Sequence, residues 1–212
     1  VEDAALLSGR GRFIDDLGTV PGTLHAAILR SPRAHAEISH IDVAEALSLP
    51  GVAAVLTGQD IASVSAPMVS GLKIPVENWP IAIERVRYAG EPVAVALAES
   101  RALAEDAIDL IEVAFRDLPA VVDPILSLSP EAAILHHAQG SNLASDRHFR
   151  YGDPEAAFSA ADDVVSIAAC YPRNGGMPME TFGIVAEYDP HGDAYDILSN
   201  FQGPFSLHAV MA

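Results

Sequence analysis

Cysteine and lysine are almost absent from this 212-residue chain, which contains only Cys170 and Lys73. A single cysteine excludes a disulfide within the chain, and it excludes any cysteine-rich metal or iron–sulfur site built from this chain alone. So little cysteine fits a reducing compartment, and we expect a cytoplasmic protein.

Positive charge is also scarce, with 12 Lys plus Arg against 29 Asp plus Glu and a formal net charge of −17. Nucleic acids and anionic membrane surfaces attract basic side chains, so neither is an expected partner. The longest apolar runs, such as residues 52–56 and 93–98, have the length of a strand and fall far short of the ~20 residues that span a membrane. No basic segment followed by an apolar one opens the chain, so no signal peptide is visible.

Hydrophobic residues are plentiful, at 50% of the chain against 19% charged. This balance predicts a packed core and excludes disorder as the main state. The length predicts one large domain or two small ones.

The apolar periodicity predicts an α/β packing unit in the first part of the chain. We expect strands at residues 22–30, 37–42, 52–57, 85–88, 93–98 and 112–115, a short helix at 43–47, and a helix capped by Ser100. In the first strand Leu24, Ala26 and Ile28 share one face. Residues 62–80 are rich in proline and lack a period, which predicts a long surface loop.

The second part of the chain shows sparser signals. Asp153 and Pro154 predict the start of a helix that runs through Ala161. Strands are expected at residues 164–169, 181–187 and 195–199, with a hairpin turn between the last two. An amphipathic helix begins at Pro204 and has no stop signal before Ala212. Together with a first residue of Val, this leads us to expect a piece of a longer product.

No histidine or cysteine stands out as catalytic. His136 and His137 are adjacent and therefore point in different directions, so a loop surface is far more probable for them than a metal site. His25 and His35 lie on or beside strands, where an ordinary hydrogen-bonded histidine is the favoured interpretation. Cys170 ends a predicted apolar strand, and we expect a buried structural thiol rather than a nucleophile.

Motifs for phosphate binding and nucleophilic catalysis are missing as well. Neither Ser8-Gly9-Arg10-Gly11 nor Gly175-Gly176 has the spacing of a phosphate loop, and there is no nucleophile elbow. The acidic runs at residues 105–109 and 162–163 are most simply solvated faces or caps. By spacing alone, no complete catalytic site is expected, and no metal ligand is predicted.

Three stretches, in the same order along the chain, nevertheless resemble one known family. They are Ser8-Gly9-Arg10-Gly11-Arg12-Phe13-Ile14-Asp15-Asp16, then Val86-Arg87-Tyr88-Ala89-Gly90-Glu91-Pro92-Val93, and finally Ser199-Asn200-Phe201-Gln202-Gly203-Pro204-Phe205. Together with the segments between them, they resemble the molybdopterin-binding large subunit of the xanthine dehydrogenase/aldehyde oxidase family of molybdenum hydroxylases. That family includes the aerobic carbon monoxide dehydrogenases.

The resemblance implies an α+β fold with two parts. Residues 1–125 are expected to form an α/β-hammerhead domain and residues 126–140 a linker. Residues 141–212 are expected to form the truncated N-terminal part of the first molybdopterin-binding domain.

The resemblance also implies one residue that contacts the cofactor. The glutamine at the position of Gln202 hydrogen-bonds an oxo ligand of the molybdenum in the family, which orients that ligand without adding one to the metal. Many relatives read Ser/Thr-Thr-Gln where this chain has Asn200-Phe201-Gln202, so Phe201 changes the packing beside the glutamine. Without the family, the alternative for Gln202 is an ordinary amide that caps the following helix. Glu180 carries over as a structural carboxylate near the site.

The implied function is that of a molybdenum-dependent oxidoreductase that acts on a heteroaromatic or aldehyde substrate, with water as the oxygen source. Molybdopterin would be the cofactor. The expected partners are the remaining molybdopterin-binding domains together with iron–sulfur and FAD domains or subunits, in an assembly that is a dimer. The remaining pterin contacts and the family's basic glutamate have no counterpart here, so this chain alone is expected to be inactive. The alternative is a non-catalytic assembly or interaction module derived from the same family.

Overall fold

The computed structural model describes residues 3–69, 76–172, 175–178 and 180–211. The chain divides into two compact units. One is Pro21–His148, and the other combines Val1–Val20 with Phe149–Ala212.

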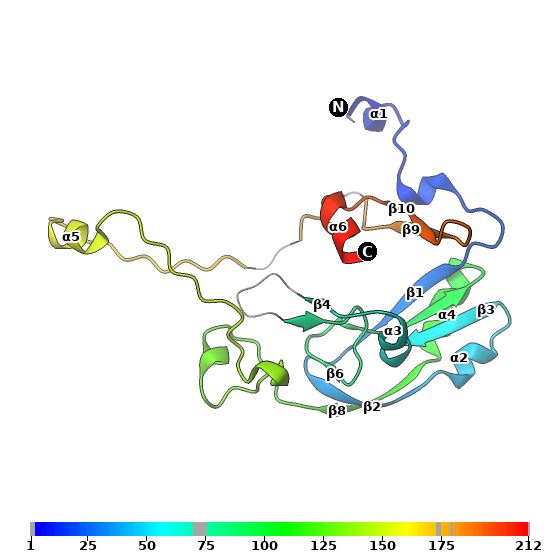
Figure 1. Cartoon of the computed structure of the whole chain (residues 1–212), viewed down its shortest axis with the longest axis horizontal. Helices are drawn as coiled ribbons and strands as arrows, with labels where there is room; N and C mark the ends of the chain where they lie inside the picture. Colours follow the sequence, from blue (N-terminus) through cyan, green and yellow to red (C-terminus); the bar gives the residue numbers. More distant parts are fainter. Residues whose placement is uncertain (1–2, 70–75, 173–174, 179, 212) are drawn as a thin grey trace. The chain divides into compact units, whose positions relative to one another are not determined.

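The unit Pro21–His148 is built on an antiparallel sheet of three strands in the order β1-β7-β3. The strands are β1 (His25–Arg30), β7 (Pro92–Ala98) and β3 (Val52–Thr57). β7 takes the central place because nearly all of its side chains are small or β-branched and apolar, as the sequence PVAVALA shows. The helix α4 (Arg101–Asp109) packs on this sheet beside β1 and β3 (Figure 1).

A second antiparallel sheet in this unit has the order β6-β2-β8. It consists of β6 (Arg85–Val86), β2 (Ala36–Asp42) and β8 (Glu112–Asp117). A short helix, α2 (Ala44–Ser48), follows β2, and the Asp42 carboxylate accepts a hydrogen bond from the Ala44 N–H at 2.9 Å. The sequence predicted this helix within one residue.

Small side chains let the elements of this unit approach closely. Ala98 in β7 and Ala104 in α4 are fully buried and pack together with Ala27 of β1. Gly58 lies so close to the segment that precedes β6 that a Cβ there would be 2.3 Å from the Ala82 carbonyl oxygen. The core is therefore packed by small side chains that let backbones approach closely, as well as by larger apolar side chains.

Two predictions in this unit need correction. The predicted loop at 62–80 contains the end of α3 (Gly58–Val64) and two short paired strands, β4 (Met68–Val69) and β5 (Glu77–Asn78); residues 70–75 lie outside the described part. The helix forms because Thr57 and Asp60 cap its first turn reciprocally. Leu24 and Ile28 do lie on one face, but that face is exposed, and Ala27 on the other face is buried.

The unit that contains Phe149–Ala212 has much less buried surface. Its elements are α1 (Asp3–Leu7), the 3-10 helix η1 (Ile14–Leu17), α5 (Pro154–Ser159), the antiparallel hairpin of β9 (Ile184–Asp189) and β10 (Ala194–Ser199), and α6 (Pro204–Met211). Asp153 caps α5 as predicted, because its carboxylate accepts a hydrogen bond from the Ala156 N–H. The helix ends two residues before Ala161.

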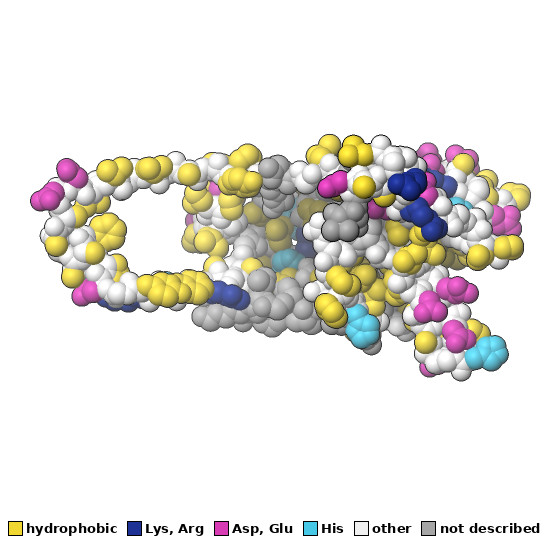
Figure 2. All heavy atoms as spheres, turned by 90° about the horizontal axis from the view of Figure 1, so that it is seen from above, with side chains coloured by type: hydrophobic (Ala, Val, Ile, Leu, Met, Phe, Trp, Pro, Cys, Tyr) yellow, Lys and Arg dark blue, Asp and Glu magenta, His cyan; other side chains and the backbone are white. Residues whose placement is uncertain are grey.

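The predicted strand at 164–169 is wrong, because those residues are irregular in the structure. Strand hydrogen bonds need a neighbouring strand, and this segment pairs with none among the described residues. Val165 and Ile167 are therefore exposed. Figure 2 shows hydrophobic side chains along the irregular segments on either side of α5. Cys170 is exposed too, so the prediction of a buried thiol is also wrong.

The helices of the described residues are all too short or too polar to cross a bilayer.

Candidate functional site

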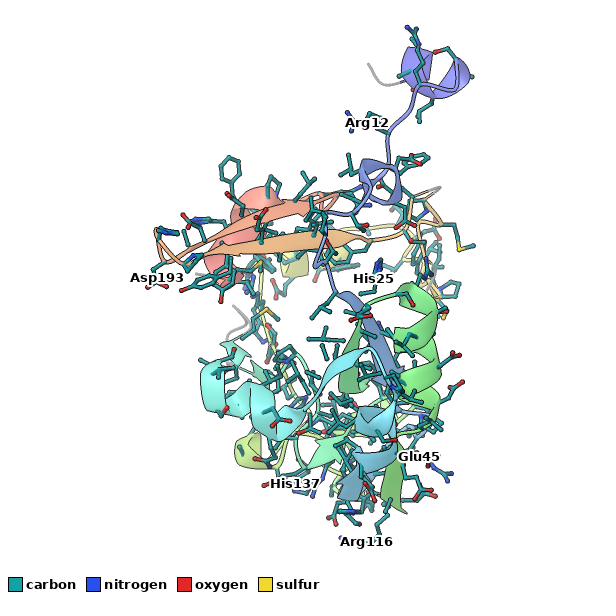
Figure 3. All side chains as sticks on the ribbon, turned by 90° about the vertical axis from the view of Figure 1, so that its right-hand side faces the viewer. Arg12, His25, Glu45, Arg116, His137 and Asp193 are labelled. Carbon is teal, nitrogen blue, oxygen red and sulfur yellow. The ribbon has the colours of Figure 1, made fainter. Side chains whose placement is uncertain are left out.

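Gln202 lies in the short turn that joins β10 to α6. Asp193 marks the turn at one end of the β9–β10 hairpin (Figure 3), and Gln202 follows the other end. The last residue pair of the hairpin is Ser199 with Ile184, so the chain leaves the sheet immediately before the glutamine. Gln202 therefore lies just beyond the open end of the β9–β10 hairpin.

Two polar side chains hold this end of the hairpin together. The Asn200 carboxamide accepts a hydrogen bond from the Gly183 N–H at 3.0 Å and donates one to the Thr181 carbonyl at 2.8 Å. The Ser199 hydroxyl donates to the Gly183 carbonyl at 3.1 Å and accepts from the Phe201 N–H at 3.2 Å. The segment before Gln202 is therefore bound to the segment before β9.

Aromatic packing adds to these hydrogen bonds. The rings of Phe182 and Phe201 meet edge to face, with centroids 6.0 Å apart and planes at 90°. This is a favourable geometry for an aromatic pair. Phe201 also stands close to Gly203, where a Cβ would be 3.1 Å from the Phe201 ring. The phenylalanine that departs from the family pattern thus has a defined packing partner.

Glu180 links this region to the N-terminal stretch of the same unit. Its carboxylate accepts a hydrogen bond from the Ile14 N–H at 2.7 Å. The Ile14 side chain lies against Gly183, where a Cβ would be only 3.1 Å away. Such contacts fit the expected structural carboxylate near the site.

The Gln202 side chain is exposed and makes no hydrogen bond to any other described residue. It does not act as the helix cap that the alternative interpretation requires. A primary amide of this kind has two N–H donors and one carbonyl acceptor available for an external group. The turn therefore exposes the neutral amide of Gln202, and the contacts of Ser199, Asn200 and Phe201 hold the turn in place.

A second candidate site is a cavity of about 370 Å³ in the unit Pro21–His148. Glu91, Arg87 and His136 are among its lining residues. Glu91 is 9% exposed, accepts a hydrogen bond from the Arg87 N–H, and lies 3.9 Å from the Arg87 guanidinium. Burial raises the pKa of Glu91, and the Arg87 N–H and charge oppose this shift.

Arg87 is committed to structural contacts in this cavity. Its guanidinium also donates to the Leu135 carbonyl at 3.0 Å and to the Arg85 carbonyl at 3.3 Å. Burial, helped by the nearby Arg87 charge, lowers the pKa of His136. Glu91 and Arg87 are thus bound to each other and to nearby backbone groups, which is a structural arrangement.

The other histidines and the acidic runs carry no site. His35 is buried, and its Nδ1 lies 2.7 Å from the Pro119 carbonyl oxygen, as expected for a hydrogen-bonded histidine. Its Nε2 is also buried and has no hydrogen-bond partner among the described residues. His137 is exposed in the 3-10 helix η3 (His137–Gln139). Within the described ranges, no group of three or more His, Cys, Asp or Glu side chains is gathered as a metal site.

Comparison with known proteins places these features in a family. Residues 8–119 match the family model described as the a/b hammerhead domain of aldehyde oxidase and xanthine dehydrogenase, and residues 135–212 match that of a molybdopterin cofactor-binding domain. The chain belongs to the aldehyde oxidase and xanthine dehydrogenase family. The predicted α+β fold, a hammerhead domain followed by the start of a molybdopterin-binding domain, is thereby confirmed.

Individual members of the aldehyde oxidase and xanthine dehydrogenase family are similar over nearly the whole chain. The nicotine 6-hydroxylase large subunit of Paenarthrobacter nicotinovorans is 37% identical over 211 residues, which cover 96% of this chain and 25% of the relative. The carbon monoxide dehydrogenase large chain of Hydrogenophaga pseudoflava is 34% identical over 225 residues, covering 100% of this chain and 28% of the relative. The chain therefore spans about a quarter of the length of the curated relatives it matches.

A solved structure of the family agrees with the fold. The crystal structure of quinoline 2-oxidoreductase from Pseudomonas putida 86 superposes with a TM-score of 0.85 at 38% identity, covering 95% of this chain and 26% of that one. The domain bounds at 1–125, 126–140 and 141–212 and the role of Gln202 stay predictions.

Sequence reasoning did not find Ser199 and Asn200 as supports of the Gln202 turn. A signal was present in the pattern: two hydrogen-bonding side chains stand where an apolar strand ends, directly before the glutamine. Side chains of this kind replace backbone hydrogen bonds where a ladder stops. Their partners on the other strand could not be read from the sequence.

Proposed function

We propose that this chain contributes the hammerhead domain and the first part of the molybdopterin-binding domain to a molybdenum hydroxylase large subunit. The complete enzyme oxidises a heteroaromatic ring or an aldehyde, with oxygen supplied by water. The observation that carries this proposal is the exposed Gln202 amide, which bonds to no other described residue and lies on a turn inside the segment that matches a molybdopterin cofactor-binding domain.

The residues of the turn fit a molybdenum cofactor. A neutral amide that has no partner among the described residues is suited to donate a hydrogen bond to an oxygen held by the cofactor. When bound, the cofactor supplies the two-electron oxidation–reduction chemistry. Gln202 would donate an N–H to the bound cofactor, while Ser199 and Asn200 keep the turn in place.

Glu180 has a supporting part in this proposal. Its carboxylate accepts a hydrogen bond from the Ile14 N–H, which is a structural contact within the unit. It fastens the start of the unit to the stretch that precedes β9. We therefore assign Glu180 the part of stabilising the surroundings of the turn.

The proposed assembly extends beyond this chain. Relatives carry the names large subunit, large chain and complex subunit gamma, which describe components of multi-subunit enzymes. We propose that iron–sulfur and FAD domains or subunits accept the electrons and that the whole assembly is a cytoplasmic dimer. The net charge of −17 opposes nucleic acid as a partner.

The experiment is the Gln202→Ala variant of the complete, molybdenum-loaded enzyme. Turnover should be measured with quinoline, nicotine, benzaldehyde and carbon monoxide as electron donors and a dye as the acceptor, because relatives are named for three of these. We expect kcat to fall roughly 10- to 100-fold, the range found when a group that orients a metal's ligands is removed. The molybdenum content, measured by elemental analysis, should stay unchanged.

The control is Gln139→Ala, a glutamine in η3 of the other unit. Gln139 lies within the molybdopterin-binding match, at residues 135–212, but it belongs to the other compact unit and is not part of the Gln202 turn. The variant should therefore leave kcat within about twofold. Unchanged kinetics in Gln202→Ala would refute the metal role and favour the assembly module.

A further inference from the structure

We propose that Asn200 is a positioning residue that sets the direction of the Gln202 amide. This inference rests on the proposed function, because Asn200 acts through Gln202. The main chain leaves the β9–β10 hairpin after Ser199, and from there the Asn200 side chain makes the hydrogen bonds to the neighbouring segment.

The hydrogen-bonding pattern at the end of the hairpin carries the first step. The last main-chain pair is Ser199 with Ile184. One position further on, the Asn200 carboxamide bonds to both the Gly183 N–H and the Thr181 carbonyl. Its C=O and N–H thereby do the work of a peptide group in a strand, so the backbone of Asn200 is free to turn toward α6.

The two bonds bracket Phe182, and this gives the second step. The neighbouring residue Phe201 places its ring against Phe182. A polar contact and an apolar contact in adjacent positions fix the path of the chain at two points. Gln202 is the next residue, so rotation of its backbone is limited by both contacts.

The irregular segment that Asn200 holds, just before β9, has contacts of its own to the N-terminal stretch of the unit. Glu180 bonds to the Ile14 N–H, and the Ile14 side chain packs on Gly183. The two hydrogen bonds of Asn200, here called the Asn200 clamp, thus reach a segment that is itself held by the contacts of Glu180 and Ile14. Movement of the Gln202 turn would require at least one of these contacts to break.

Only asparagine fits the two bonds at this reach. Aspartate can accept from the Gly183 N–H but cannot donate to the Thr181 carbonyl. Serine or threonine has a single oxygen on a shorter side chain and cannot reach both groups. A misplacement of about 1 Å at a group that orients reacting atoms can cost as much as 100-fold in rate, so losing the clamp should be visible in kcat.

The test compares Asn200→Ala and Asn200→Asp with Asn142→Ala in the complete, molybdenum-loaded enzyme. Asn142 is a matched control, because its carboxamide accepts from the Leu135 N–H at 2.9 Å and donates to the Ser127 and Ala133 carbonyls at 3.0 and 2.8 Å. It therefore makes the same kind of clamp in the other unit. The readouts are hydrogen exchange at the Gly183 and Leu135 amides, and kcat and KM for the best substrate of the panel above.

In Asn200→Ala we expect Gly183 exchange to speed up about fivefold to tenfold, the effect of one lost hydrogen bond. We expect kcat to fall about tenfold with KM within about twofold. Asn200→Asp should keep slow Gly183 exchange and lose about threefold in kcat. Asn142→Ala should speed exchange at Leu135 and leave both Gly183 exchange and kcat unchanged.

The outcomes separate this inference from the proposed function. If Gln202→Ala lowers kcat and Asn200→Ala does not, the positioning role is refuted and the metal role of Gln202 stands. If Gln202→Ala leaves kcat unchanged, the proposed function fails and the positioning role fails with it, whatever the Gly183 exchange rate shows. An equal loss of kcat in Asn142→Ala would also overturn the inference, because it would indicate a general loss of structure.

Discussion

The strands β7 and β9 show how differently the two units are stabilised. In β7, Val93, Ala94, Ala96 and Ala98 are each at most 1% exposed, whereas every residue of β9 is exposed. Both strands are apolar in part and both are paired by an antiparallel ladder. What differs is the cover: α4 packs on the sheet of β7, and no described element of its own unit buries β9.

Because apolar burial contributes about 25 cal/mol per Å², substitutions in the core of the unit Pro21–His148 should cost much stability. The β9–β10 hairpin depends more on individual hydrogen bonds, such as those of Ser199 and Asn200. Substitutions at comparable positions in the two units should therefore have unequal effects.

The largest difference is expected between Gly58→Ala and Gly176→Ala. A Cβ on Gly58 would lie 2.3 Å from the Ala82 carbonyl oxygen, whereas one on Gly176 meets nothing within 4 Å. Backbone atoms cannot move aside cheaply, so we expect Gly58→Ala to lower the free energy of unfolding by about 3 kcal/mol or more. Gly176→Ala should change it by less than about 0.5 kcal/mol. Urea denaturation of both variants measures this, and equal midpoints would contradict the difference in packing.

A smaller difference is expected when one valine is shortened in each unit. Val93 in β7 is 1% exposed, and Val185 in β9 is 42% exposed. Val93→Ala should cost about 2 kcal/mol of unfolding free energy from lost burial and the cavity left behind. Val185→Ala should cost under about 0.5 kcal/mol. If thermal melting showed a larger loss for Val185→Ala, the hairpin would have to be covered in solution.

The smallest effect is a pH dependence that belongs to the buried core. Burial raises the pKa of Glu91 above its ordinary 4.5, so the folded protein holds this proton more tightly than the unfolded chain. The resulting stabilisation is fully present below pH 4.5 and is lost as pH rises through the folded-state pKa. Glu91→Gln should remove this part of the pH dependence, while Glu187→Gln in the exposed strand β9 should retain it. Urea midpoints between pH 4 and pH 8 provide the measurement; a dependence that persists in Glu91→Gln would exclude Glu91 as its source.

The sequence predicted the elements whose signals are local. Val52–Thr57, the Ser100 cap, the Asp153–Pro154 helix start and the turn between β9 and β10 were all identified from residue type and spacing. Local signals also placed Gln202 after a strand and before a helix. The Thr57–Asp60 cap was of the same local kind and was missed beside a proline-rich segment.

Failures occurred where the outcome depended on a distant partner. Residues 164–169 have the composition of a strand, but strand formation needs a second strand, and Cys170 is exposed for the same reason. Leu24 and Ile28 have the pattern of a buried face, yet the small side chain of Ala27 faces α4 and the core. Apolar periodicity states which side chains share a face and not which face will be covered.

By itself, the sequence determined the family, the α+β class, most elements and the position of Gln202 between β10 and α6, because these depend on neighbours along the chain. Only the tertiary structure decided that Asn200 reaches back to Thr181 and Gly183 and that Glu180 binds the Ile14 N–H. Those contacts join residues 17 to 166 positions apart. Contacts at such separations arise from the folded path of the chain, which no local pattern specifies.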